Sequence, residues 1–266
     1  MKKVAKLRIE NLKEELVEEI ARVNKEDGEL TTLRLKALEI AKSLSQLQIK
    51  GLDFSQYEPV GLFYPVERND QGIDISQKFD DQSLNRSGYL SEVDSRVHLK
   101  RLSEESERGG VILLPIEEAL KRERELVLGY LGKIFKKESH RFAAMIHALR
   151  SGGVFLYVPE GISLNEPIYI HHELKRKNQA VFAHSIFVVE KNASARIVYE
   201  ISSRKVYTGT FFDLQEVQLG ENSRLVLTLL QNVSEEAKLV SLKATKGESG
   251  SFLRDITLWL CLLYTS

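Results

Sequence analysis

The sequence predicts a mainly β protein in which an α-helical amino-terminal region precedes a β-solenoid. Charged residues with apolar residues at helical spacing fill much of the first half of the 266-residue chain. Short apolar runs separated by polar corners fill the second half. At the junction, the apolar run over residues 154–158 is stopped by Pro159 and turned through Gly161. Such runs are typical of short strands joined by tight corners.

Two helices are predicted near the amino terminus. Residues 9–24 place apolar side chains at helical spacing among Glu and Lys, and Asp27-Gly28 is expected to end this helix. A second helix is expected from Thr31, fading by Gln46. Residues 51–110 have few sustained apolar runs, so we expect an irregular region with two short strands there.

Regular structure is predicted again from residue 109. Residues 109–115 form an apolar run typical of a buried strand, and residues 116–135 carry an apolar helical stripe opposite a charged face, which we interpret as solvated. Residues 142–149 predict a short helix, with Gly152-Gly153 as its stop.

A weak repeat follows in the β part. The segment that begins at Glu190 recurs at Gly220 and, loosely, at Gly247, which places Asn192, Asn222 and Ser249 at 30- and 27-residue spacings. This spacing suits one coil of a β-solenoid, in which each coil buries its apolar residues by stacking on its neighbours. An antiparallel β-sandwich is the alternative. We expect a cap region over 1–150, an incomplete solenoid core over 151–260 and a non-native tail over 261–266.

Composition excludes several classes of protein. The chain has 38 Lys plus Arg and 38 Asp plus Glu, so it has no net positive charge that would attract nucleic acid. The basic amino terminus has no apolar segment behind it, as a secretory signal would, so a cytoplasmic location is expected. Cys261 is the only cysteine, which leaves no internal disulfide and no cysteine cluster for zinc or an iron-sulfur centre.

The last six residues, 261–266, resemble one reading frame of a sequencing-library adapter, and we interpret them as an artefact. The alternative is an apolar carboxy-terminal strand. From Ile256 onward the segment is shorter than the roughly 20 apolar residues that a membrane helix needs. A membrane partner is therefore not expected.

No catalytic or metal-binding residue is predicted. His171 and His172 are adjacent on an extended segment and point to opposite faces, so we expect a surface or corner role. His147 and His184 are interpreted as structural, with His184 kept as a minor candidate ligand. Asp213 and Glu216, expected at a strand start, are too few carboxylates for the calcium site of a β-helix carbohydrate enzyme. Gly152-Gly153 is not followed by the Lys-Ser/Thr of a phosphate loop, so it does not predict nucleotide binding.

Several separate segments together resemble the SufB/SufD family of iron-sulfur cluster assembly proteins. The likeness covers most of residues 30–258 and is strongest from 110 to 232. The segments that carry it are 34–38, 110–120, 130–133, 141–159, 166–168, 216–226 and 231–232. The resemblance implies a right-handed parallel β-helix with a helical cap and a carboxy-terminal helical segment. It also implies a non-catalytic scaffold that works with a SufC-like ABC-type ATPase, which binds the ATP, and with a SufB-like paralogue or a second copy.

The lack of other cysteines and of a long amino-terminal extension favours the SufD side of the family. The chain ends before the segments where the family's functional residues lie, so no residue here inherits a role. An iron-sulfur cluster is expected to be handled transiently by the full complex and not bound by this chain. A β-helix carbohydrate-active enzyme and a generic β-solenoid interaction module are the alternatives.

Overall fold

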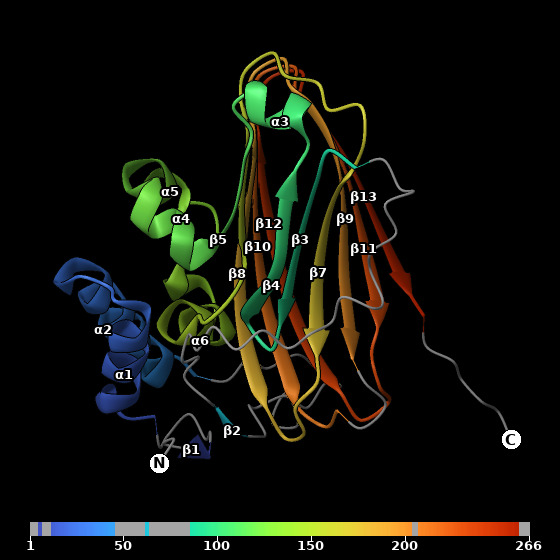
Figure 1. Ribbon diagram of the computed structural model, residues 1–266. Coiled ribbons are helices and arrows are strands. Elements are labelled where there is room, and N and C mark those ends of the chain that lie inside the picture. The colour runs from blue at the N-terminus through green and yellow to red at the C-terminus, as the bar shows by residue number, and fades with distance from the viewer. Residues whose placement is uncertain (1–4, 7–11, 46–61, 64–85, 204–206, 261–266) are drawn as a thin grey trace, which may run out of the picture.

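A computed structural model describes residues 5–6, 12–45, 62–63, 86–203 and 207–260. Helices cover one side of a tall stack of strands (Figure 1). The two short strands β1 (Ala5–Lys6) and β2 (Leu62–Phe63) pair with each other. No helix of the described residues is long and apolar enough to span a bilayer.

Two amino-terminal helices, α1 (Glu14–Asn24) and α2 (Gly28–Ser43), form an antiparallel pair. Helix α1 ends when Lys25 adopts a left-handed conformation with φ 52°. The Asp27 side chain then caps α2 by accepting a hydrogen bond of 3.0 Å from the Leu30 amide. The expectation that Asp27-Gly28 ends the first helix was therefore wrong, because a helix-capping aspartate starts the next one.

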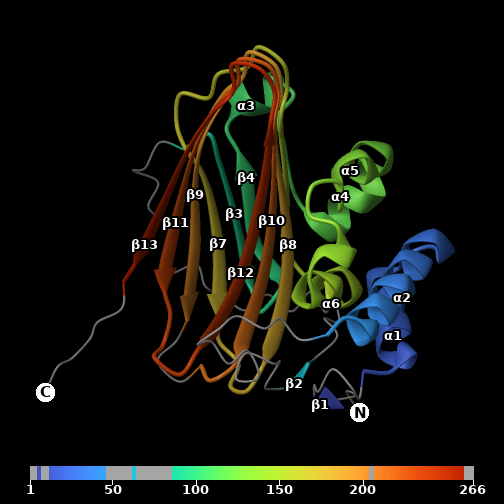
Figure 2. The same ribbon diagram turned by 180° about the vertical axis from the view of Figure 1, so that it is seen from behind.

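The strands of the second half form a parallel β-solenoid of about three turns, as predicted. Strands β6 (Val154–Val158), β8 (Ala180–Val189), β10 (Thr210–Leu219) and β12 (Lys238–Gly247) stack in parallel in one sheet. Strands β7 (Ile168–Leu174), β9 (Ser194–Ser203), β11 (Arg224–Asn232) and β13 (Phe252–Trp259) do the same in the other. Consecutive strands alternate between the sheets, which excludes the antiparallel sandwich (Figure 2).

Three earlier strands extend these sheets. In one sheet β3 (Gly88–Val93) pairs with β7 in parallel and with β4 (Arg96–Leu102) in antiparallel fashion; in the other, β5 (Ile112–Pro115) lies antiparallel to β6. Helix α3 (Glu104–Arg108) connects β4 to β5. β3 and β4 are short strands within the region predicted to be irregular, of which residues 51–61 and 64–85 lie outside the described residues. The domain division at residue 150 stays a prediction.

The repeat in the sequence marks one corner of the solenoid. Asn192 and Asn222 have φ values of 56° and 55°, and Gly250 has 70°. Each of the three lies two residues before its strand, in the register that pairs Arg224 with both Ser194 and Phe252. The structural counterpart of Asn222 is thus Gly250 and not Ser249, because glycine readily takes the left-handed conformation that this corner requires.

The charged segment after β5 forms two short helices where one was predicted. Helices α4 (Ile116–Arg122) and α5 (Arg124–Tyr130) are separated by Glu123, whose φ of −124° and ψ of 40° are not helical. A non-helical segment and the 3₁₀ helix η3 (Lys137–Ser139) then lead to α6 (Arg141–Leu149). The predicted helix over 142–149 is therefore confirmed, whereas the one over 116–135 ends five residues early.

Alternation along each strand builds two cores. One set of side chains fills the solenoid interior, with Leu156, Phe187 and Ile197 among them. The opposite face of the β8–β10 sheet packs against the helices, where the Phe182 and Phe212 rings stack with centroids 4.7 Å apart. This second core joins the cap to the solenoid, so the two parts share one packed interface.

Candidate functional site

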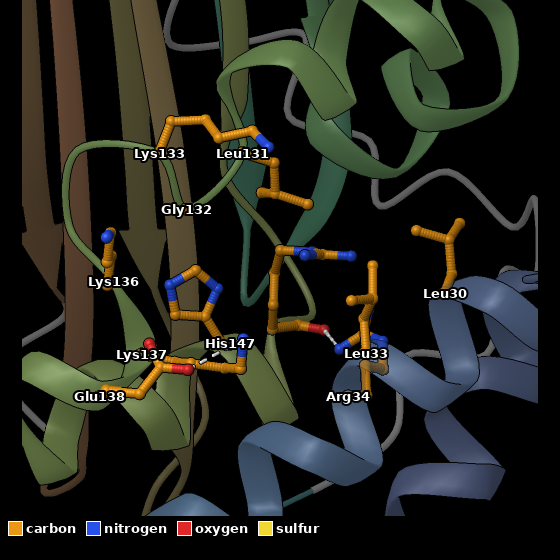
Figure 3. Close-up of a pocket in the computed structure, with 11 residues that line it drawn as sticks. Leu30, Leu33, Arg34, Leu131, Gly132, Lys133, Lys136, Lys137, Glu138 and His147 are labelled. Carbon is orange, nitrogen blue, oxygen red and sulfur yellow. Dashed lines mark hydrogen bonds and ion pairs between the residues drawn. The ribbon is translucent and has the colours of Figure 1, made fainter.

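A cavity of about 330 Å³ lies among the helices of the cap region, and all of its lining residues fall within residues 30–150. Its walls come from α2, from the segment 131–138 and from α6. Figure 3 shows Leu30, Leu33 and Arg34 of α2 facing the segment that carries Leu131, Gly132 and Lys133, with His147 of α6 near its centre. The lining residues are Leu30, Leu33, Arg34, Leu131, Gly132, Lys133, Lys136, Lys137, Glu138, His147 and Arg150.

Glu216 holds the segment 131–136 against the solenoid. Its carboxylate accepts hydrogen bonds from the amides of Gly132 at 2.7 Å, Ile134 at 2.9 Å and Phe135 at 2.7 Å. Burial alone would raise the pKa of Glu216, but these bonds and a contact with His184 hold it below its ordinary value. The ionised carboxylate therefore fixes one wall of the cavity.

His184 and His147 belong to the same arrangement. The His184 Nε2 atom lies 3.1 Å from Glu216 Oε2, and the two imidazoles meet edge to face with centroids 4.9 Å apart. Burial lowers the pKa of His147 to about 3, so this ring is neutral at physiological pH. Within the described ranges no three His, Cys, Asp or Glu side chains are arranged to hold a metal ion. The geometry supports structural roles for both histidines.

A buried cluster of four charges fixes the other wall. Arg34 of α2 donates to both Glu26 carboxylate oxygens, at 2.7 and 2.6 Å, and to the carbonyls of Ala148 and Arg150. Arg150 in turn donates to Glu117 of α4 at 2.7 Å. Burial alone would raise the pKa of Glu117, but Arg150 and Arg34 lower it to about 2. Two positive and two negative side chains thus join α2, α4 and α6.

His171 and His172 lie within β7, both buried, which corrects the predicted surface or corner position. Their opposite orientations are as predicted. His172 lies inside the solenoid, where its Nδ1 atom is 3.2 Å from Glu92, whereas His171 contacts Ser202 of the neighbouring strand at 2.7 Å. The sequence reasoning failed because a solenoid strand can bury both of its faces.

Asp213 and Glu216 lie in the middle of β10 and not at a strand start. Asp213 accepts hydrogen bonds inside the solenoid from Tyr199 at 2.8 Å and from Gln215 at 2.6 Å, while Glu216 faces the cap. The two carboxylates are therefore on opposite sides of one sheet and cannot flank a common glycosidic bond, as a hydrolase requires. This removes the carboxylate pair on which the carbohydrate-enzyme alternative depended.

Gly152 and Gly153 allow the backbone to pass close to β8 where the chain enters the solenoid. Gly153 has φ +116°, and a Cβ atom there would lie 2.1 Å from the His184 carbonyl oxygen. The main role of the glycines is therefore to allow close contact with the neighbouring strand. They are not needed to end α6, because that helix already ends at Leu149. Cys261 and the rest of the tail lie outside the described residues.

Sequence reasoning missed the acidic partners in these clusters. Glu26 lies in the charged connection between the first two helices, Glu117 lies in a charged helical segment interpreted as solvated, and Glu92 lies in a region without clear periodicity. Only their distant partners, Arg34, Arg150 and His172, distinguish them from surface glutamates. No local signal in the sequence marks such pairs.

Comparison with known proteins finds similar sequences over much of the chain. Residues 66–170 match the family model described as the SufBD protein N-terminal region. The chain is 28% identical over 210 residues to the iron-sulfur cluster assembly protein SufB of Bacillus subtilis, covering 74% of this chain and 45% of that protein. It is 28% identical over 236 residues to an iron-sulfur cluster assembly SufBD family protein of Pyrococcus horikoshii, covering 84% of this chain and 53% of the relative.

A SufBD family protein of Staphylococcus haemolyticus is 25% identical over 257 residues, covering 90% of this chain and 55% of the relative. The chain thus spans about half the length of the curated relatives it matches. These matches cover both the cap and the strands, and the parallel solenoid agrees with the fold that the sequence resemblance implies. Over most of its length the chain is similar to iron-sulfur cluster assembly proteins of the SufB/SufD family.

Proposed function

We propose that this chain is part of a SufD-like scaffold subunit of an iron-sulfur cluster assembly complex. In this proposal it works in the cytoplasm with a SufC-like ABC-type ATPase and with a SufB-like paralogue or a second copy. The observation that carries the proposal is the match of the family's amino-terminal region to residues 66–170, which contain the strands β3 to β6 and the start of β7, where the solenoid begins.

The packing supports a scaffold role. Three buried carboxylates act as structural ties: Glu216 holds the cap segment, Glu117 joins helices, and Asp213 accepts hydrogen bonds inside the solenoid. Each accepts hydrogen bonds from donors of this chain, which supports a structural role for these carboxylates. The cluster would therefore be cargo of the assembled complex, and ATP would be bound by the ATPase.

Cysteine content favours the SufD side over the SufB side. Thiolates are the usual ligands of iron-sulfur clusters. The sole cysteine of this chain is Cys261, in the segment interpreted as non-native. A chain without other cysteines suits a structural subunit whose partner supplies the ligands.

Co-expression and anaerobic reconstitution test the proposal. The gene's uninterrupted reading frame is expressed with a SufC-like ATPase and a SufB-like subunit, and iron and sulfide are measured on each purified species. We expect the three proteins to co-purify and the cluster to form only in the complex. Stoichiometric cluster on this subunit alone would contradict the SufD-like assignment, and a subunit that captures neither protein would contradict the scaffold role.

A further inference from the structure

The cavity in the cap region has walls that are held by hydrogen bonds. On one side Glu216 ties the segment 131–136 to β10 through three backbone amides. On the other, Arg34 ties α2 to the end of α6 by donating to the Arg150 carbonyl at 2.8 Å. A volume of about 330 Å³ is in the range of natural ligand pockets. The cavity is thus preorganised.

The unbalanced charge of the cavity is positive. Arg34 and Arg150 are neutralised by Glu26 and Glu117, so they add no net charge. Of the remaining cationic side chains, Lys137 pairs with Glu138 at 3.3 Å. Lys133 and Lys136 are exposed, and neither makes a salt bridge to a residue in the described part of the chain. Among the described residues, the cavity lining therefore has more positive than negative side chains, on a chain whose formal net charge is zero.

Aliphatic side chains line the opposite wall. Leu30 and Leu33 of α2 contribute to it, and Leu33 keeps 38% of its surface exposed (Figure 3). A free inorganic anion would leave this wall in water. A ligand that places a carboxylate near the lysines and an aliphatic group on the leucines would satisfy both parts.

We propose that this cavity docks a segment of a partner protein in which acidic side chains alternate with aliphatic ones. The charge complementarity with Lys133 and Lys136 selects the acidic residues, and Leu33 contacts the aliphatic ones. This proposal goes beyond the assembly role and does not depend on it, because it rests only on the geometry of the cap.

Fluorescence anisotropy with a labelled hexapeptide of alternating Glu and Leu tests the proposal on the complete subunit. We expect saturable binding that weakens with salt. The double variant Lys133→Glu/Lys136→Glu should bind at least about tenfold more weakly, since each charge reversal turns an attraction into a repulsion. The matched control Lys42→Glu, an exposed lysine of α2 outside the cavity, should change the affinity less than about twofold.

Three further arms decide the outcome. A Lys/Leu hexapeptide should not bind, and Leu33→Asp should weaken the Glu/Leu peptide without lowering Tm, because Leu33 is exposed. Inorganic phosphate at millimolar concentration should not displace the peptide. Absence of peptide binding to the wild type, equal binding by the double variant, or full displacement by phosphate would each overturn the proposal.

Discussion

The buried arginine of α2 gives the sharpest test of how the cap is held on the solenoid. Arg34 makes five hydrogen bonds: two to Glu26, one to Glu117, and one each to the carbonyls of Ala148 and Arg150. Only 2% of its side chain is exposed. Arg34→Met keeps the bulk of the side chain but leaves Glu26, Glu117 and Arg150 with a net buried charge of minus one.

Breaking one partner out of a buried ion cluster typically costs about 3–5 kcal/mol. For a chain of this size that corresponds to a fall in Tm of at least about 6 °C. The exposed pair of Arg122 with Glu118, at 2.9 Å with 61% of the Arg122 side chain accessible, is the matched control. Arg122→Ala should cost less than about 1 kcal/mol. Calorimetric melting of the two variants and the wild type measures both effects.

A compensating substitution separates charge from packing. In Arg34→Met/Glu26→Gln the remaining Glu117 and Arg150 form a neutral pair at 2.7 Å, so part of the lost stability should return. A double variant as unstable as the sum of the single ones would refute the charge argument. So would an Arg34→Met protein that melts within a degree of Arg122→Ala.

The same cluster predicts a pH dependence. The folded pKa of Glu117, about 2, is below its ordinary 4.5, so this group's stabilising contribution is present above pH 4.5 and is lost as the pH falls toward 2. Removing Arg34 takes away one of the cations that lower the pKa of Glu117. The difference in Tm between wild type and Arg34→Met should therefore narrow on acidification through this window, and a difference that grows there would contradict the assignment.

Three other outcomes follow from the fold. Gly153→Ala should fail to fold or lose several degrees of Tm, whereas Gly161→Ala, also at positive φ but with open space around it, should retain most of its stability. The chain should self-associate in light scattering through β13, where Leu258 and Trp259 are 47% and 73% exposed; Trp259→Lys should reduce this, and a monodisperse wild type would argue against it. Deleting 261–266 should leave Tm unchanged, and a loss of several degrees would show that the tail is native structure.

The solenoid was predictable from sequence because its signal is periodic. Corners near Asn192 and Asn222 recur at the length of one coil, and successive side chains along each strand point to opposite faces of the sheet. The third corner was misplaced by one residue because Gly250 and Ser249 both suit a turn, and only the strand register distinguishes them. Local patterns therefore predicted the architecture, but they did not predict which residues of successive coils are equivalent.

The helical region was less predictable at its boundaries. Both helices near the amino terminus were expected, but Asp27 was interpreted as a stop when it is a cap. The break at Glu123 has no proline or glycine to announce it. Helix ends depend on hydrogen bonds a few residues away and on tertiary packing, so composition alone does not place them.

The candidate site could not be derived from sequence because its bonds join residues that are far apart in the chain. Glu216 lies 84 residues from Gly132, and Arg34 lies 83 from Glu117. In isolation each looks like an ordinary charged residue of a strand or a helix. Their roles arise only when the solenoid brings β10 beneath the segment 131–136 and the cap brings α2 beside α6. A cavity built this way inherits its shape from the whole fold, so Glu216→Gln should alter the cap segment while the solenoid stays intact.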